Sequence, residues 1–166
     1  MTDSQKLLIG GGLLLLVLSL LYGLWYALAV EHQRLDQIGA SLAGSFVQAA
    51  DGNLDSAHGQ LQKYGDARYR YIREVDAHSH WTGLALLLVL LGLAFDQLAF
   101  AERVRLWLAR VLLVSAAAFP ASVLWQNFDH GSAPRVASAI FGAALVASMA
   151  CIAFGFIRRK PQPSSI

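Results

Sequence analysis

The sequence predicts an all-α integral membrane protein with four transmembrane helices and a two-helix extracytoplasmic hairpin between the first and second of them. Of its 166 residues, 56% are hydrophobic and only 14% are charged, and the mean hydropathy is +0.48. A soluble domain normally carries about a quarter charged residues. The apolar residues also gather in four long blocks, which indicates that lipid surrounds most of the chain. This composition excludes an ordinary soluble enzyme.

The first apolar block covers residues 7–30 and contains no charged side chain. At about 1.5 Å per helical residue, it is long enough to cross a hydrocarbon core of about 30 Å. Residues 27–29 have the small-x-small form of a signal-peptidase site, which would make the block a secretory signal. However, the block is longer than the usual core of such signals, and Trp25 and Tyr26 crowd the cleavage site. We therefore expect span one to be retained.

The next segment predicts two helices outside the membrane, each continuous with a span and each with a heptad-like seam. The seam positions are Leu35, Ile38, Leu42, Ser45 and Ala49 in the first helix, and Leu54, Ala57, Leu61, Tyr64, Arg68, Tyr71 and Val75 in the second. Asp51, Gly52 and Asn53 form the turn between the two helices, with Gly52 placed to adopt a left-handed conformation. Gly59 and Gly65 weaken the second helix, so a bend is expected there.

Two isolated helices bury little apolar area, so this hairpin needs a partner. It could pair with a second copy to form a four-helix bundle, or dock against another membrane subunit. The order of span, outer helical hairpin and span over residues 7–100 resembles the sensing modules of bacterial chemoreceptors and sensor kinases. That resemblance implies a hairpin that receives a signal or binds a partner. The sequence departs from such receptors after Lys160, where they continue into a large output domain.

Three further apolar blocks form spans two to four, at residues 81–100, 106–128 and 136–157. Pro120 in the third span removes a backbone donor and should kink that helix. In the fourth span, small residues recur every four positions from Ala139 to Gly155, which lets another helix approach closely. The predicted organisation is 1–30 for the cytoplasmic N-terminus and span one, 31–80 for the outer hairpin, 81–157 for spans two to four, and 158–166 for a cytoplasmic tail.

The Lys and Arg residues of the connecting segments set the orientation. With the N-terminus in the cytoplasm, the inner segments hold seven basic and three acidic residues, and the outer segments hold six basic and eight acidic residues. The positive-inside rule favours this arrangement. Tyr22, Trp25, Tyr26, Trp81 and Trp125 then fall at one outer interface, where aromatic rings are enriched. We therefore expect a multi-pass protein, typical of a bacterial inner membrane, with both termini in the cytoplasm.

All five histidines fall on the predicted outer side. Four of them lie next to span ends, and so at one level of the membrane interface: His32, His78, His80 and His130. Imidazole is the commonest metal ligand in proteins, and a ligating histidine usually gives its other ring proton to a carboxylate or carbonyl. Glu74 and Asp76 precede His78 and His80 by four positions, and so share a helix face with them.

These residues predict a haem or transition-metal site at the outer face. His78 and His80 are two residues apart, about 200° around a regular helix, so they cannot chelate one ion together. The expected ligands are therefore His78 or His80 from span two, His130 after span three and His32 as a further metal ligand. Asp76 or Glu74 would accept the other ring proton of a ligating histidine. Three such ligands suit Cu or Zn, and two imidazoles on facing helices suit a haem iron. The alternative is that the histidines bind no metal or haem and only lie at the membrane interface beside Trp and Tyr.

The sequence predicts two alternative functions, and neither of them specifies a chemical reaction. The first is a small membrane subunit that binds haem or a metal for electron transfer or metal handling. The second is a non-catalytic interaction or sensing module, in which polar substitutions along Leu35, Ile38 and Leu42 would abolish association. The expected partners are the lipid bilayer and a second copy or another membrane protein. The scattered net charge of +2 argues against nucleic acid. The absence of ionisable residues near mid-span argues against ion-coupled transport.

Overall fold

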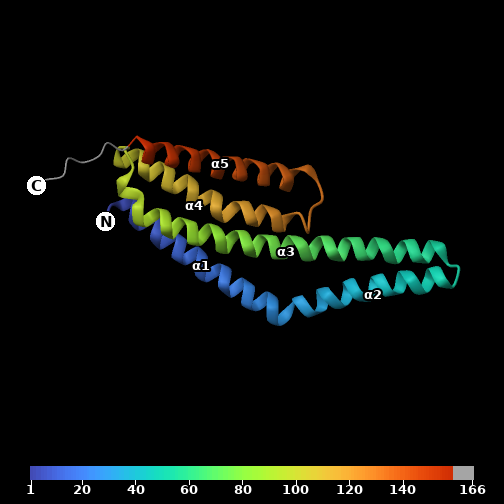
Figure 1. Cartoon of the computed structure of the whole chain (residues 1–166). Helices are drawn as coiled ribbons and strands as arrows, with labels where there is room; N and C mark the ends of the chain where they lie inside the picture. Colours follow the sequence, from blue (N-terminus) through green and yellow to red (C-terminus); the bar gives the residue numbers. More distant parts are fainter. Residues whose placement is uncertain (159–166) are drawn as a thin grey trace, which may run out of the picture.

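A computed structural model of the chain describes residues 1–158, which fold into helices joined by short connections (Figure 1). The elements are α1 (Asp3–Ala29), α2 (Glu31–Ala50), α3 (Leu54–Ala94), the 3-10 turn η1 (Phe95–Gln97), α4 (Glu102–Trp125) and α5 (Ser132–Ile157). Four helical segments are long and apolar enough to cross a membrane: Asp3–Ala29, Leu54–Gln97, Glu102–Trp125 and Ser132–Ile157. The predicted all-helical class is therefore confirmed, and the structure has four helices that could serve as the predicted spans. Residues 159–166 of the predicted tail lie outside the described part of the chain.

The longest element is α3, whose 41 residues make a rod of about 61 Å. Its first half packs against α2, and its second half packs against α1 and α4. α3 continues through Gly59 and Gly65 as one helix, so the prediction of a bend there is wrong. The two-helix unit formed by α2 and residues 54–77 of α3 is called the arm below. In Figure 1 the arm projects from one end of the remaining bundle.

α1 and α2 are separate helices, which corrects the expectation that span one continues into the arm. The break is at Val30, whose φ of −122° and ψ of −42° lie outside the regular helical values. The junction bows away from α3 in Figure 1. Large rings fill the space that this leaves: the Tyr22 ring lies 5.6 Å from Trp81 and 6.2 Å from His78, between centroids. The bend therefore comes from side-chain packing rather than from a helix-breaking residue.

The membrane bundle is built around close contact between α1 and α3. A Cβ added to Gly12 would lie 3.1 Å from the Ala85 carbonyl oxygen, and one added to Gly92 would lie 3.2 Å from the Ile9 nitrogen. The two backbones thus approach as closely as small residues allow. α4 packs against both of these helices, and α5 packs against α4. The buried core includes Leu8, Leu15, Ala85, Leu88, Leu112 and Ile152.

Three polar contacts fix the end of the bundle where α1 begins and α5 ends. The Ser4 backbone N–H donates to Glu102 Oε1 at 2.9 Å, which joins the first turns of α1 and α4. A carboxylate there is favourable because it faces the positive ends of two helix dipoles. Arg105 then pairs with Glu102 at 3.0 Å and donates to the Asp96 carbonyl oxygen at 3.0 Å. The short connection between α3 and α4 is held in this way.

The arm turns at Gly52, whose φ of +77° is the left-handed conformation that its position predicts. Ile38, Leu42 and Ser45 of α2 lie at least half-buried against α3, as expected for a seam. The second helix differs from the prediction. Its seam uses Ala57, Gln60, Tyr64, Ala67, Tyr71 and Glu74, whereas Leu54, Leu61, Arg68 and Val75 are exposed, together with Leu35 of α2.

Candidate functional site

His78 packs against α1 rather than into an open site. Its ring occupies a notch over Gly23, where an added Cβ would lie 2.5 Å from the His78 Cε1 atom. The Ser19 hydroxyl lies 3.4 Å from His78 Nδ1 and 2.7 Å from the Thr82 hydroxyl. The Thr82 hydroxyl also lies within reach of the His78 carbonyl oxygen, to which it donates at 3.0 Å. These contacts give His78 a packing role between α1 and α3.

The other predicted ligands face other neighbours. The His80 ring meets the Phe119 ring of α4 edge-on, at 5.1 Å between centroids. His130, in the connection between α4 and α5, lies 6.0 Å from the Tyr69 ring. His32 is exposed in the first turn of α2. The structure thus keeps the four histidines on separate contacts, although all of them lie near the base of the arm.

The two predicted carboxylates do not join the histidines either. Glu74 bonds to Arg34, and Asp76 is partly exposed on α3. Among residues 1–158, no group of three or more His, Cys, Asp and Glu side chains is placed to hold a metal ion. A three-ligand Cu or Zn site is therefore not formed by this arrangement of side chains. Binding of haem or a metal at His78, His80 and His130 stays a prediction.

A charged pair that sequence reasoning did not single out holds the base of the arm. Arg34 of α2 makes two parallel bonds to the Glu74 carboxylate, Nη2 to Oε1 at 2.9 Å and Nε to Oε2 at 3.2 Å. The two side chains are only 25% and 11% exposed. The hydrogen bonds that Arg34 donates to the Glu74 carboxylate raise the pKa of the Arg34 guanidinium above its ordinary value. This bidentate geometry fixes the direction of α2 relative to α3.

Two signals in the sequence could have revealed this pair. Arg34 and Glu74 carry opposite charges, and they lie 19 and 21 positions on either side of Asn53. In a helical hairpin, residues nearly equidistant from the turn lie opposite one another. A charge-by-charge comparison across the predicted turn would therefore have paired them.

A second polar network joins the middle of α3 to the end of α4 and the start of α5 at the same level. The Tyr69 hydroxyl donates to Gln126 Oε1 at 3.3 Å, and Gln126 Nε2 donates to the Ser138 hydroxyl at 2.9 Å. The Ser122 hydroxyl lies 3.0 Å from that of Ser138. Gln126 and Ser122 are both buried. These bonds tie the arm helix to the last two spans at the bundle surface from which the arm projects.

The arm has one polar side. A groove of about 270 Å³ runs along it, between the two helices. The groove is lined by Gln37 and Ser41 of α2 and by Lys63, Asp66, Ala67 and Arg70 of α3. Because both helices contribute to this groove, their polar stripes lie on the same side of the arm.

The opposite side of the arm is apolar. Residues two apart on a helix point about 200° away from each other, so Leu61 and Leu35 face away from Lys63 and Gln37 of the groove. Residues at steps of seven and eleven from these two share their stripe within about 20°. These steps give the exposed apolar set Leu35, Phe46, Leu54, Leu61 and Ile72, which we call the apolar face. They also place the exposed Arg68 on the same stripe, seven residues after Leu61.

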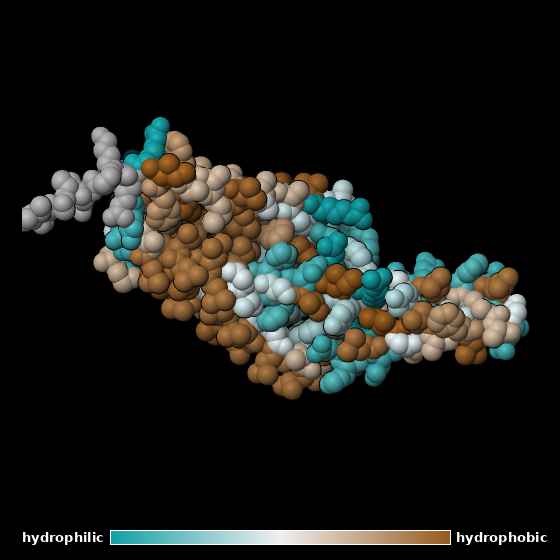
Figure 2. Space-filling view, in the orientation of Figure 1, coloured by the Kyte–Doolittle hydropathy of each residue, from teal (hydrophilic) through white to brown (hydrophobic). Residues whose placement is uncertain are grey.

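The exposure of the apolar face is high for side chains of this size. Phe46 is 68% exposed, Leu54 is 62% exposed and Leu61 is 49% exposed. Figure 2 shows brown side chains on the arm beyond the broad brown surface of the membrane bundle, with polar side chains between them. Large apolar side chains gathered on one side of a helical hairpin that also carries many charges make this side a candidate interaction surface.

Comparison with known proteins finds no matching family model, no matching curated protein and no matching solved structure.

Proposed function

We propose that this protein is a non-catalytic, membrane-anchored interaction module that associates through its arm. In this proposal the arm lies on the outer side of a bacterial inner membrane, and both termini lie in the cytoplasm. The distribution of Lys and Arg supports this orientation. The aromatic side chains at the base of the arm, among them Tyr22, Trp25 and Trp81, support the level of the interface.

The observation that carries the proposal is the two-sided arm. Its seam holds Ile38, Leu42 and two tyrosines beside small and polar residues, while further large apolar side chains, such as Leu54, Leu61 and Phe46, remain on the apolar face. A helical hairpin that kept these side chains for its own packing would turn them inward. Because these side chains point outward, we expect the helices of a partner to bury them.

We take the partner to be a second copy of this chain. Two copies in one membrane present their arms in the same direction, so a two-fold axis along the membrane normal brings identical apolar faces together. The four arm helices then form a bundle with a shared core. A face about 30 Å long and about 20 Å wide offers about 600 Å² per copy, below the usual 800 Å² or so of a stable soluble complex. Confinement to the membrane offsets this shortfall by raising the effective concentration.

The test is the oligomeric state of the purified protein by sedimentation equilibrium in density-matched detergent. We expect a dimer for the unmodified chain, and at least tenfold weaker association for Leu61→Glu combined with Ile72→Glu. Both residues are exposed, so the double variant should fold normally. Gln37→Glu adds one negative charge on the polar side of the arm and should leave the dimer intact. A monomeric unmodified protein, or equal association of all three, would overturn the proposal.

A further inference from the structure

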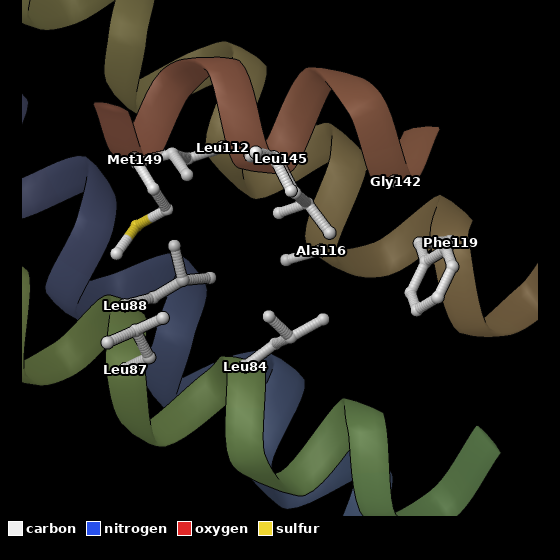
Figure 3. Close-up of a pocket in the computed structure, with 10 residues that line it drawn as sticks. Leu84, Leu87, Leu88, Leu112, Ala116, Phe119, Gly142, Leu145 and Met149 are labelled. Atoms are coloured by element: carbon white, nitrogen blue, oxygen red, sulfur yellow. The ribbon is translucent and has the colours of Figure 1, made fainter. Parts of the chain in front are cut away.

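A groove in the membrane bundle lies apart from the arm, between α3 and α5. Both helices pack on α4, and the space left between them has a volume of about 390 Å³. In Figure 3, Leu84 and Leu88 of α3 face Leu145 and Met149 of α5 across the groove, with Ala116 of α4 at its floor. Its lining is almost entirely aliphatic, with Phe119 as the aromatic member. The volume lies within the usual range of small-molecule sites, about 300–1,000 Å³.

The groove is closed at the end away from the arm. There the connection between α3 and α4 crosses to α5, where the Ala99 backbone N–H donates to the Gly155 carbonyl oxygen at 3.2 Å. Gly155 is needed for this crossing because an added Cβ would lie 2.5 Å from the Phe100 ring and 3.0 Å from Leu98. Leu98 and Phe100 thus join α3 to α5 below the groove. A long chain can enter only from the side or from the end near the arm.

The end near the arm carries groups that suit a polar head. The exposed His80 ring lies against Phe119, and it is one helical turn before Leu84 on the face that lines the groove. The exposed Arg135 is two turns before Gly142, another lining residue, and so shares its stripe on α5. Asp76 lies one further turn out on α3. The cation of Arg135 complements a phosphate at this level, directly above an aliphatic channel.

We infer that the groove between α3, α4 and α5 binds one phospholipid of the outer leaflet. One acyl chain lies along Leu84, Leu88, Leu145 and Met149, and the lipid phosphate lies beside Arg135. The aliphatic walls and the closed inner end favour one acyl chain of limited length. A protein helix would be too wide for a groove of this volume. This inference does not depend on association through the arm; only the assignment to the outer leaflet rests on the orientation proposed above.

The experiment counts lipid molecules that stay bound after purification in mild detergent, by native mass spectrometry with added phosphatidylglycerol. We expect one retained lipid per chain. Gly142→Phe places a ring in the groove, where a Cβ meets only Phe119 at ordinary contact distance, and should lower the occupancy at least fivefold. Gly10→Phe is the matched control, because Gly10 faces open space on α1 and this variant should keep the lipid. Arg135→Gln, at the start of α5, should weaken retention of the lipid. Arg103→Gln, at the start of α4 and so at the opposite end of the bundle, should not.

A photoactivatable phospholipid with its reactive group in the acyl chain then locates the site in membranes. Crosslinks concentrated in residues 84–88 and 142–149 support the inference. Crosslinks spread evenly over the lipid-facing sides of all four spanning helices contradict it, because they indicate only the surrounding bilayer. Unchanged occupancy in Gly142→Phe, or a groove that crosslinks a second protein chain instead of lipid, also overturns it.

Discussion

At the scale of single residues, the base of the arm depends on one charged pair. Arg34 and Glu74 are largely buried and bond to each other in a bidentate geometry. Removing one partner of such a pair leaves a charge that is both desolvated and unpaired, which costs more than the pair itself contributes. The pair therefore acts mainly by specifying how α2 lies on α3.

We expect Glu74→Ala to lower the free energy of unfolding by about 1–3 kcal/mol, less than for a fully buried pair because both groups keep some contact with water. Arg34→Ala should have a similar effect, and the double variant should lose less than the sum of the two. Unfolding by denaturant titration in detergent micelles measures this. The exposed Arg70→Ala serves as the control and should stay within about 0.5 kcal/mol of the unmodified protein. Additive losses in the double variant would show that the two side chains do not depend on each other.

The histidines also belong to the residue scale, because their function depends on where each ring points. Haem or metal binding predicts a Soret band, or near-stoichiometric Cu or Zn, in protein produced with these available. His80→Ala and His130→Ala should each reduce that signal, and His58→Ala near the tip of the arm should not. Absorption spectra and elemental analysis measure this. Colourless and metal-free protein under these conditions would leave His78 and His80 with the packing roles that their contacts show.

At the scale of elements, the contact between α1 and α3 sets the geometry of the bundle. Gly12 lies at a close approach of the two helices, while Gly10, two residues earlier on the same helix, faces open space. The two positions differ in packing and not in intrinsic helix propensity. They therefore offer a matched measurement of the helix contact.

Gly12→Val should destabilise the bundle by about 1–3 kcal/mol, because the new side chain meets Val89 and the Ala85 carbonyl, and the backbone cannot yield cheaply. Gly10→Val should have little effect. The two variants can be compared by their resistance to denaturant unfolding, followed by circular dichroism. Equal stability of both would mean that α1 and α3 do not meet at Gly12.

The elements also show what the sequence can and cannot predict. The four spans and the turn at Gly52 follow from local properties, namely hydropathy and the freedom of glycine, and the structure has both. The break at Val30 depends on rings from α1 and α3 that pack only in the folded chain, so no local signal marks it. The level of the histidines follows from the span ends. The direction of each ring depends on helix rotation, and the sequence leaves open two seams of α3 that differ by about a sixth of a turn.

At the scale of the whole molecule, the apolar surface has two parts with different surroundings. The broad band around α1, α4, α5 and the second half of α3 suits lipid tails (Figure 2). The apolar face of the arm lies beyond this band, where polar solvent would meet it unless another chain covers it. The continuous α3 rod connects the two parts.

The most direct measurement of the central claim is cysteine crosslinking between copies in intact membranes. In a Cys151→Ser background, Leu61→Cys places a thiol on the apolar face and Lys63→Cys places one on the polar side, two residues away on the same exposed helix. Association through the apolar face predicts a strong disulfide-linked dimer for Leu61→Cys on mild oxidation, and little for Lys63→Cys. Equal or stronger crosslinking at Lys63→Cys, or none at either position, would contradict it.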